Sequence, residues 1–170
     1  MRNIFTEAEN DYSFINKYFK EELFFKDLIG NTKEEVLRNI CDAVHKVMEV
    51  PEDFYQLVIE REEMATTEFG NNIALPHPIK PITKSTFVAI GMLKKPIKWE
   101  RLQVKFVFLI STKKDSTESL SLFNESITAL VFNKKAMLKL EKEPTLKTLK
   151  EIIREMAIQE KDNTIDNLFK

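Results

Sequence analysis

Glycine is scarce in this sequence: Gly30, Gly70 and Gly91 are the only three, and they lie far apart. A phosphate-binding P-loop, a dinucleotide fingerprint and a nucleophile elbow each need at least two closely spaced glycines. None of these motifs can be written from the sequence. Standard nucleotide binding and serine hydrolysis are therefore not expected.

Cysteine and histidine are also rare. Cys41 is the only cysteine, which excludes an internal disulfide and a cysteine-rich zinc site. The two histidines are His45 and His77. His45 lies on the edge of an apolar helical stripe, where a structural role is expected. The sequence supplies no cluster of metal ligands, so we expect neither a metal nor a cofactor.

Neither a charge excess nor a long apolar run is present. The 26 basic and 27 acidic side chains give a net charge of −1, which provides no electrostatic footprint for nucleic acid or an anionic membrane. The apolar runs are shorter than the roughly 18 residues of a transmembrane span, and acids interrupt the N-terminus where a signal peptide would be apolar. We expect a cytoplasmic protein with no direct nucleic-acid contact and no membrane insertion.

Periodicity predicts an α/β domain in which helices flank a mixed sheet. Thr32 and Glu35 have the spacing of a helix capping box, and an apolar stripe at helical spacing follows as far as Pro51. Residues 85–93 and 103–110 are rich in β-branched and aromatic residues and predict strands. Two further helices are expected over residues 120–131 and 146–156. Residues 56–62 fit a short helix turn or a strand.

The expected domain spans residues 1–158. Residues 1–24 are expected to be an N-terminal extension or linker, in which Ser13 caps a helix bearing Ile15, Tyr18, Phe19 and Leu23. From Gln159 the chain is mostly polar, and residues 159–170 are expected to form a tail that is a candidate for disorder.

His77 and Arg61 are the residues best suited to chemistry. Pro76 and Pro78 form a stiff, non-helical frame around His77. This is either a surface loop histidine or a neutral imidazole held ready as a nucleophile or a base. Arg61 is either a solvated charge or a fork of donors for a phosphoryl group. Glu62 either orients Arg61 or is merely exposed.

The pattern Arg61-Glu62, Thr67, Gly70, Ile73-Ala74 and Pro76-His77 closely resembles the active-site segment of enzyme IIA (EIIA) domains of the sugar phosphotransferase system, fructose–mannitol type. The resemblance covers roughly residues 25–155. It implies that His77 accepts a phosphoryl group from the carrier HPr and passes it to a IIB partner. It further implies that Arg61 stabilises the phosphoryl charge and that Thr67 and Glu62 contribute to binding.

One departure from the family pattern leaves two uses open. Transporter members carry a second histidine near the position of Ser119, and this sequence has none there. The domain is therefore either a transporter component that feeds a IIB partner or a regulatory domain. A regulatory domain would belong to a transcriptional antiterminator or activator with PRD regulatory domains in the same polypeptide. A pure interaction module, in which His77 is never phosphorylated, is the alternative from a different class.

Overall fold

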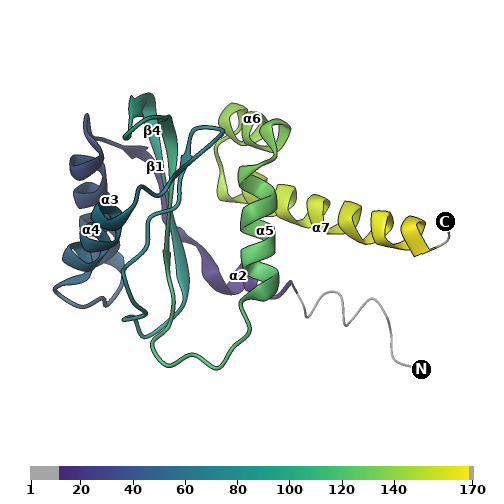
Figure 1. Cartoon of the computed structure of the whole chain (residues 1–170), viewed down its shortest axis with the longest axis horizontal. Helices are drawn as coiled ribbons and strands as arrows, with labels where there is room; N and C mark the ends of the chain where they lie inside the picture. The colour runs from purple at the N-terminus through teal and green to yellow at the C-terminus, as the bar shows by residue number, and fades with distance from the viewer. Residues whose placement is uncertain (1–11, 169–170) are drawn as a thin grey trace. The chain divides into compact units, whose positions relative to one another are not determined.

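A computed structural model describes residues 12–168, without the side chains of residues 161 and 164–166 (Figure 1). The expectations for residues 1–11 and 169–170 lie outside this part. The chain divides into two compact units. We call residues 16–118 the sheet unit, and residues 12–15 with 119–168 the helical unit. The short helix α2 (Phe14–Tyr18) crosses from the helical unit into the sheet unit.

The sheet unit contains a five-stranded mixed sheet with the strand order β1-β4-β5-β3-β2. β4 runs antiparallel to β5, β1 runs parallel to β4, and β3 runs parallel to β5 and antiparallel to β2. The predicted α/β class and the strands expected at 85–93 and 103–110 are confirmed. The strands are β1 (Phe19–Leu28), β2 (Glu68–Phe69), β3 (Ile73–Ala74), β4 (Phe87–Lys98) and β5 (Gln103–Ser111).

Strand β1 replaces most of the helix that was predicted upstream. That helix ends at Tyr18, and its expected residues Phe19 and Leu23 lie in β1. The buried positions of β1 are Phe19, Leu23 and Leu28, because register shifts interrupt its pairing with β4. Bulges of this kind break the two-residue alternation of a strand, so the spacing imitated a helix. The last residues of the segment 1–24 therefore belong to the sheet.

Two helices belong to the sheet unit: α3 (Lys33–Val47) and α4 (Phe54–Met64). The predicted cap of α3 is confirmed, since Thr32 Oγ1 accepts a hydrogen bond from Glu35 N at 3.2 Å. The Glu35 carboxylate reaches back to the N–H of Asn31 at 2.8 Å. α4 includes residues 56–62, so this stretch is helix and not strand.

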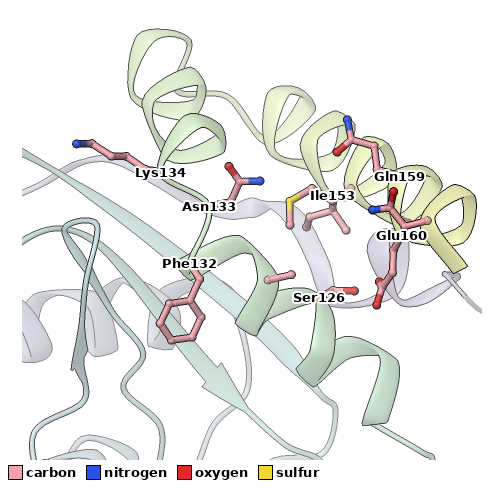
Figure 2. Close-up of a pocket in the computed structure, with 11 residues that line it drawn as sticks. Ser126, Phe132, Asn133, Lys134, Ile153, Gln159 and Glu160 are labelled. Carbon is pink, nitrogen blue, oxygen red and sulfur yellow. The ribbon is translucent and has the colours of Figure 1, made fainter. Parts of the chain in front are cut away.

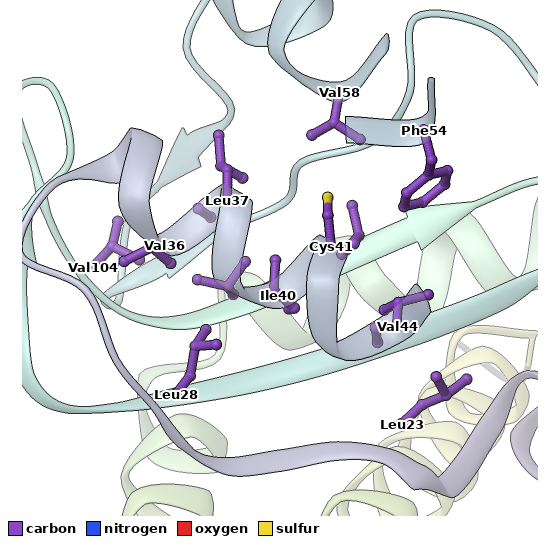
Figure 3. Packing of buried hydrophobic residues seen from close by; sticks show 14 of the residues in the cluster. Leu23, Leu28, Val36, Leu37, Ile40, Cys41, Val44, Phe54, Val58 and Val104 are labelled. Carbon is purple, nitrogen blue, oxygen red and sulfur yellow. The ribbon is translucent and has the colours of Figure 1, made fainter. Parts of the chain in front are cut away.

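The apolar face of α3 packs on the sheet and forms the centre of the core (Figure 3). Full burial of one such side chain contributes roughly 1.5–3 kcal/mol relative to exposure. Burial, with a smaller contribution from Asp42, raises the pKa of the Cys41 thiol to about 12. Cys41 is therefore a core residue and not a thiolate nucleophile at neutral pH. The buried residues of α3 are Val36, Leu37, Ile40, Cys41 and Val44.

The helical unit contains α5 (Ser121–Val131), α6 (Lys134–Lys142) and α7 (Leu146–Leu168), which contact one another. α5 and α7 correspond to predicted helices. α6 was not predicted; its cap is Asn133, whose side chain accepts from Ala136 N at 3.0 Å. The polar segment expected to be disordered is helical through Leu168. No helix within residues 12–168 has the length and apolar character needed to cross a membrane.

Candidate functional site

His77 lies three residues after β3, in a segment held by main-chain hydrogen bonds on both sides. Before it, Leu75 N donates to Thr67 O at 2.9 Å, and Pro76 O accepts from Ile110 N at 3.0 Å. After it, Ile79 N donates to Leu57 O at 3.0 Å. These bonds tie the segment to the residue before β2, to β5 and to α4. The half-buried His77 is therefore presented by a backbone with little freedom.

The imidazole of His77 is held in one tautomer. Its Nδ1 lies 2.9 Å from the carbonyl oxygen of Pro78. A carbonyl oxygen only accepts, so Nδ1 carries the proton and donates. In the neutral ring the lone pair then belongs to Nε2. No hydrogen bond in the described part of the chain uses Nε2. The geometry therefore leaves the lone pair of Nε2 available.

Arg61 lies in the last turn of α4 and is half-buried. Its Nη1 donates to the carbonyl oxygen of Ala65 at 2.8 Å, which satisfies one carbonyl at the helix end. A guanidinium has five N–H groups, so donors remain for an acceptor such as a phosphoryl group. Leu57, which anchors the His77 segment, lies one helical turn before Arg61. The structure thus brings the His77 segment onto the helix that carries Arg61.

Glu62 and Thr67 are brought together, but they bind each other. Both are buried, and the Glu62 carboxylate accepts from Thr67 N at 3.1 Å and from Thr67 Oγ1. The indole Nε1 of Trp99 donates to the same carboxylate at 2.9 Å, and Lys33 Nζ lies 3.6 Å from it. Glu62 is therefore not an exposed residue. Within residues 12–168, no hydrogen bond or ion pair joins Glu62 to the Arg61 side chain.

Glu68 is a second carboxylate that binds several donors, and it was not predicted from the sequence. Its carboxylate accepts from the backbone N–H groups of residues 100, 101 and 102 at 3.0–3.1 Å, which holds the turn between β4 and β5. Burial alone raises the pKa of Glu68, but these three bonds, with Lys33 nearby, hold that pKa below its usual value. Glu62 and Glu68 bind the same turn, since Trp99 begins it.

The other two residues considered from the sequence, His45 and Ser119, take no part in these hydrogen bonds. His45 is exposed in the last turn of α3. Ser119 is exposed in the helical unit, just before α5, and its hydroxyl bonds to Ser121. Within residues 12–168 no group of three or more histidine, cysteine, aspartate or glutamate side chains has the arrangement of a metal site.

The helical unit carries a groove of about 450 Å³ between α5 and α7, whose lining includes Ser126, Phe132, Ile153 and Glu160 (Figure 2). None of the predicted site residues lines it. Its wall is formed partly by the polar end of α7, and it presents no cluster of nucleophilic or cationic side chains. We assign it no part in the candidate site.

Two curated relatives are transcriptional regulators of Bacillus subtilis. The chain is 37% identical, over 122 residues and 72% of its length, to the probable licABCH operon regulator. It is 30% identical to the transcriptional regulator ManR over 104 residues, 61% of its length. These segments amount to 19% and 16% of the two regulators, so the chain spans less than a fifth of either.

The fold resembles solved IIA structures. The crystal structure of mannitol IIA from Escherichia coli matches with a TM-score of 0.65 at 19% identity, covering 79% of this chain and 97% of that one. The same protein in complex with phosphorylated mannitol IIB matches with a TM-score of 0.63 at 19% identity, covering 81% and 99%. The model of the phosphoenolpyruvate-dependent sugar phosphotransferase system, EIIA 2, matches residues 17–156. The chain therefore belongs to the EIIA 2 family of the phosphoenolpyruvate-dependent sugar phosphotransferase system.

Proposed function

We propose that this chain is a regulatory EIIA domain of a transcriptional regulator, whose activity is controlled by phosphorylation of His77. The supporting observation is the 37% identity to the licABCH operon regulator over 72% of the chain. The lack of a second histidine near Ser119 points the same way. The transporter use, in which the phosphoryl group goes on to a IIB partner, becomes the second candidate. Its support is the fold shared with mannitol IIA.

The chemical step is transfer of a phosphoryl group from phosphorylated HPr to His77. The lone pair of Nε2 attacks phosphorus as the bond between phosphorus and the HPr atom that carries it breaks, and that HPr atom keeps the bonding pair. The Nδ1 proton stays in its hydrogen bond to Pro78 O and is not transferred. A neutral nitrogen nucleophile needs no general base, so positioning and charge stabilisation supply the catalysis.

Arg61 is the residue proposed to stabilise the transferred group. Negative charge is spread over the phosphoryl oxygens in the transition state, and a guanidinium can bind two of them at once. Arg61 stands at the end of the helix to which the His77 segment is hydrogen-bonded. Its bond to Ala65 O keeps the side chain ordered before a donor arrives.

The acceptor residue is tested by incubating the chain with enzyme I, HPr and phosphoenolpyruvate labelled on phosphorus. We expect an acid-labile, alkali-stable label that is lost in His77→Ala. His45→Ala is the matched control, because it removes the other histidine from an exposed position and is expected to keep the label. Absence of label on the wild-type chain, with HPr itself labelled, would support an interaction module without phosphorylation.

The two uses are separated in cells that carry His77→Ala in the chromosomal gene. A regulator predicts altered transcription of its target operon. It also predicts unchanged sugar uptake when the transport genes are expressed from an unregulated promoter. Loss of uptake under that promoter would instead indicate the transporter use. His45→Ala serves again as the control strain.

Phosphoryl acceptance is proposed to need no metal and no nucleotide. The test uses HPr that has been phosphorylated and separated from enzyme I, since enzyme I has a magnesium requirement of its own. We expect the labelling rate of His77 to be the same with and without a chelator. Loss of labelling in the chelator would contradict this part of the proposal.

A further inference from the structure

We propose that Glu62 is a positioning residue for His77, acting through Thr67. The inference deepens the proposed function and rests on it. Glu62 is an ionisable side chain only 3% exposed, and three donors and a lysine converge on its two oxygens. Burying a carboxylate is costly unless it is paired and hydrogen-bonded. The question is what this arrangement holds in place.

The path from Glu62 to His77 consists of hydrogen bonds to Thr67 and Leu75, followed by two residues of backbone. The carboxylate binds both the N–H and the hydroxyl of Thr67. The carbonyl of Thr67 accepts from the N–H of Leu75 at 2.9 Å. Leu75 stands two residues before His77, and Pro76 between them has a fixed φ. Displacement of Thr67 is therefore passed to the backbone that carries the imidazole.

The carboxylate is also held by two side chains that are not on this path to His77. Trp99 Nε1 donates to Glu62 Oε1 at 2.9 Å, and Lys33 Nζ lies 3.6 Å from the same oxygen. Lys33 also lies 3.7 Å from a carboxylate oxygen of Glu100. Every polar partner is a donor, so the site fits a carboxylate with acceptors only. An amide would turn an NH₂ group towards one of these donors.

These partners allow a matched pair of variants, one on the path to His77 and one outside it. Thr67→Val removes the hydroxyl that lies on the path to His77, with little change in the shape of the side chain. Trp99→Phe removes the indole donor outside that path and also leaves space in the core. If the substitutions act only by lowering stability, kcat falls in both variants, and more in Trp99→Phe. If they act by displacing His77, kcat falls in Thr67→Val.

The experiment measures kcat and KM for labelling of His77 by phosphorylated HPr, with thermal melting of each variant. We expect Glu62→Gln to lower kcat about 10-fold or more with little change in KM, because misplacement of a reacting group by ~1 Å costs up to about 10²-fold. Thr67→Val is expected to lower kcat and Thr67→Ser to restore most of it, whereas Trp99→Phe is expected to lower the melting temperature more than kcat. If Glu62→Gln does not fold, the Thr67 and Trp99 variants decide the question.

A second readout does not depend on phosphorylation. Nitrogen NMR of the His77 ring reports the Nδ1–H tautomer, which is expected to dominate in wild type and to lose dominance in Glu62→Gln and Thr67→Val. Wild-type kcat and tautomer in folded Glu62→Gln would overturn the proposal. So would equal loss of kcat in Trp99→Phe and Thr67→Val. A wild-type chain that accepts no label would overturn the proposed function instead, and the tautomer measurement would still test Glu62.

Discussion

At the scale of single residues, Arg61 combines two tasks. Its guanidinium donates to Ala65 O and so closes the end of α4, while its remaining N–H groups are proposed for the phosphoryl group. The first task concerns stability and the second concerns rate. Substitutions that separate the two are therefore informative.

We expect Arg61→Ala to slow labelling of His77 on the order of 10²-fold, the usual cost of losing a donor to developing negative charge. Loss of the bond to Ala65 O should cost only about 0.5–1.5 kcal/mol of stability. Arg61→Lys should recover part of the rate, because a point charge replaces a bidentate fork. Labelling rates and melting temperatures of the three proteins are compared. An Arg61→Ala chain that labels at the wild-type rate would make Arg61 structural.

Gly91 in β4 leaves room for two core side chains. A Cβ there would lie 2.4 Å from Leu28 Cδ2 and 3.3 Å from Ile40 Cδ1, so the ends of these side chains, from β1 and α3, would have to shift. Overpacking of this kind costs about 1–3 kcal/mol, and we expect Gly91→Ala to lose that much in urea unfolding. Gly70→Ala is the control, since its added Cβ has no neighbour within 4 Å. Equal stability of the two variants would contradict the packing argument.

At the scale of elements, the turn between β4 and β5 is held by carboxylates from the segment that leads to His77. Glu68 binds the N–H groups of residues 100–102, and Glu62 binds the indole of Trp99. The Glu68 carboxylate is accessible to protons, and its pKa is lowered in the folded state. The attachment of the turn is therefore expected to depend on pH.

Because the folded pKa of Glu68 lies below the unfolded value of about 4.3, its contribution to stability is present above that value. It is lost as the pH falls through the folded pKa. We expect Glu68→Gln to remove part of the acid dependence of the free energy of unfolding, measured in urea between about pH 3 and 7. The exposed Glu63→Gln should leave it unchanged. Parallel curves for wild type and Glu68→Gln would show that Glu68 does not hold the turn.

Elements with a regular apolar period were predictable from the sequence, and irregular or distant features were not. The α3 stripe and its Thr32 cap follow local rules, as do the two central strands. β1 was missed because its bulges space the buried residues four and five apart. His77 and its proline frame are local in sequence. The surroundings of Glu62 are not, since Trp99 is 37 residues away and only folding brings it there.

At the scale of the whole molecule, the family match crosses both compact units, from residue 17 to residue 156. The helix α7 continues beyond that match to Leu168. The described side chains from residue 159 onward are exposed, so this end of the helix contributes little to a core.

We expect a chain ended after Ile158 to melt within a few degrees of the full chain and to label at His77 within about twofold, because removal of exposed residues usually costs little. Melting temperature and labelling rate are measured on both chains. A shortened chain that unfolds, or that loses labelling, would place residues 159–170 within the domain.

The anchors of the His77 segment are bonds between main-chain atoms: Leu75 N to Thr67 O, Ile110 N to Pro76 O, and Ile79 N to Leu57 O. Main-chain bonds do not depend on the identity of the side chains that surround them. Exposed side chains such as Met64 at the end of α4 and Ile79 after His77 are thus open to replacement without loss of these bonds. An acceptor built in this way can change its protein partners during evolution while the imidazole keeps its place.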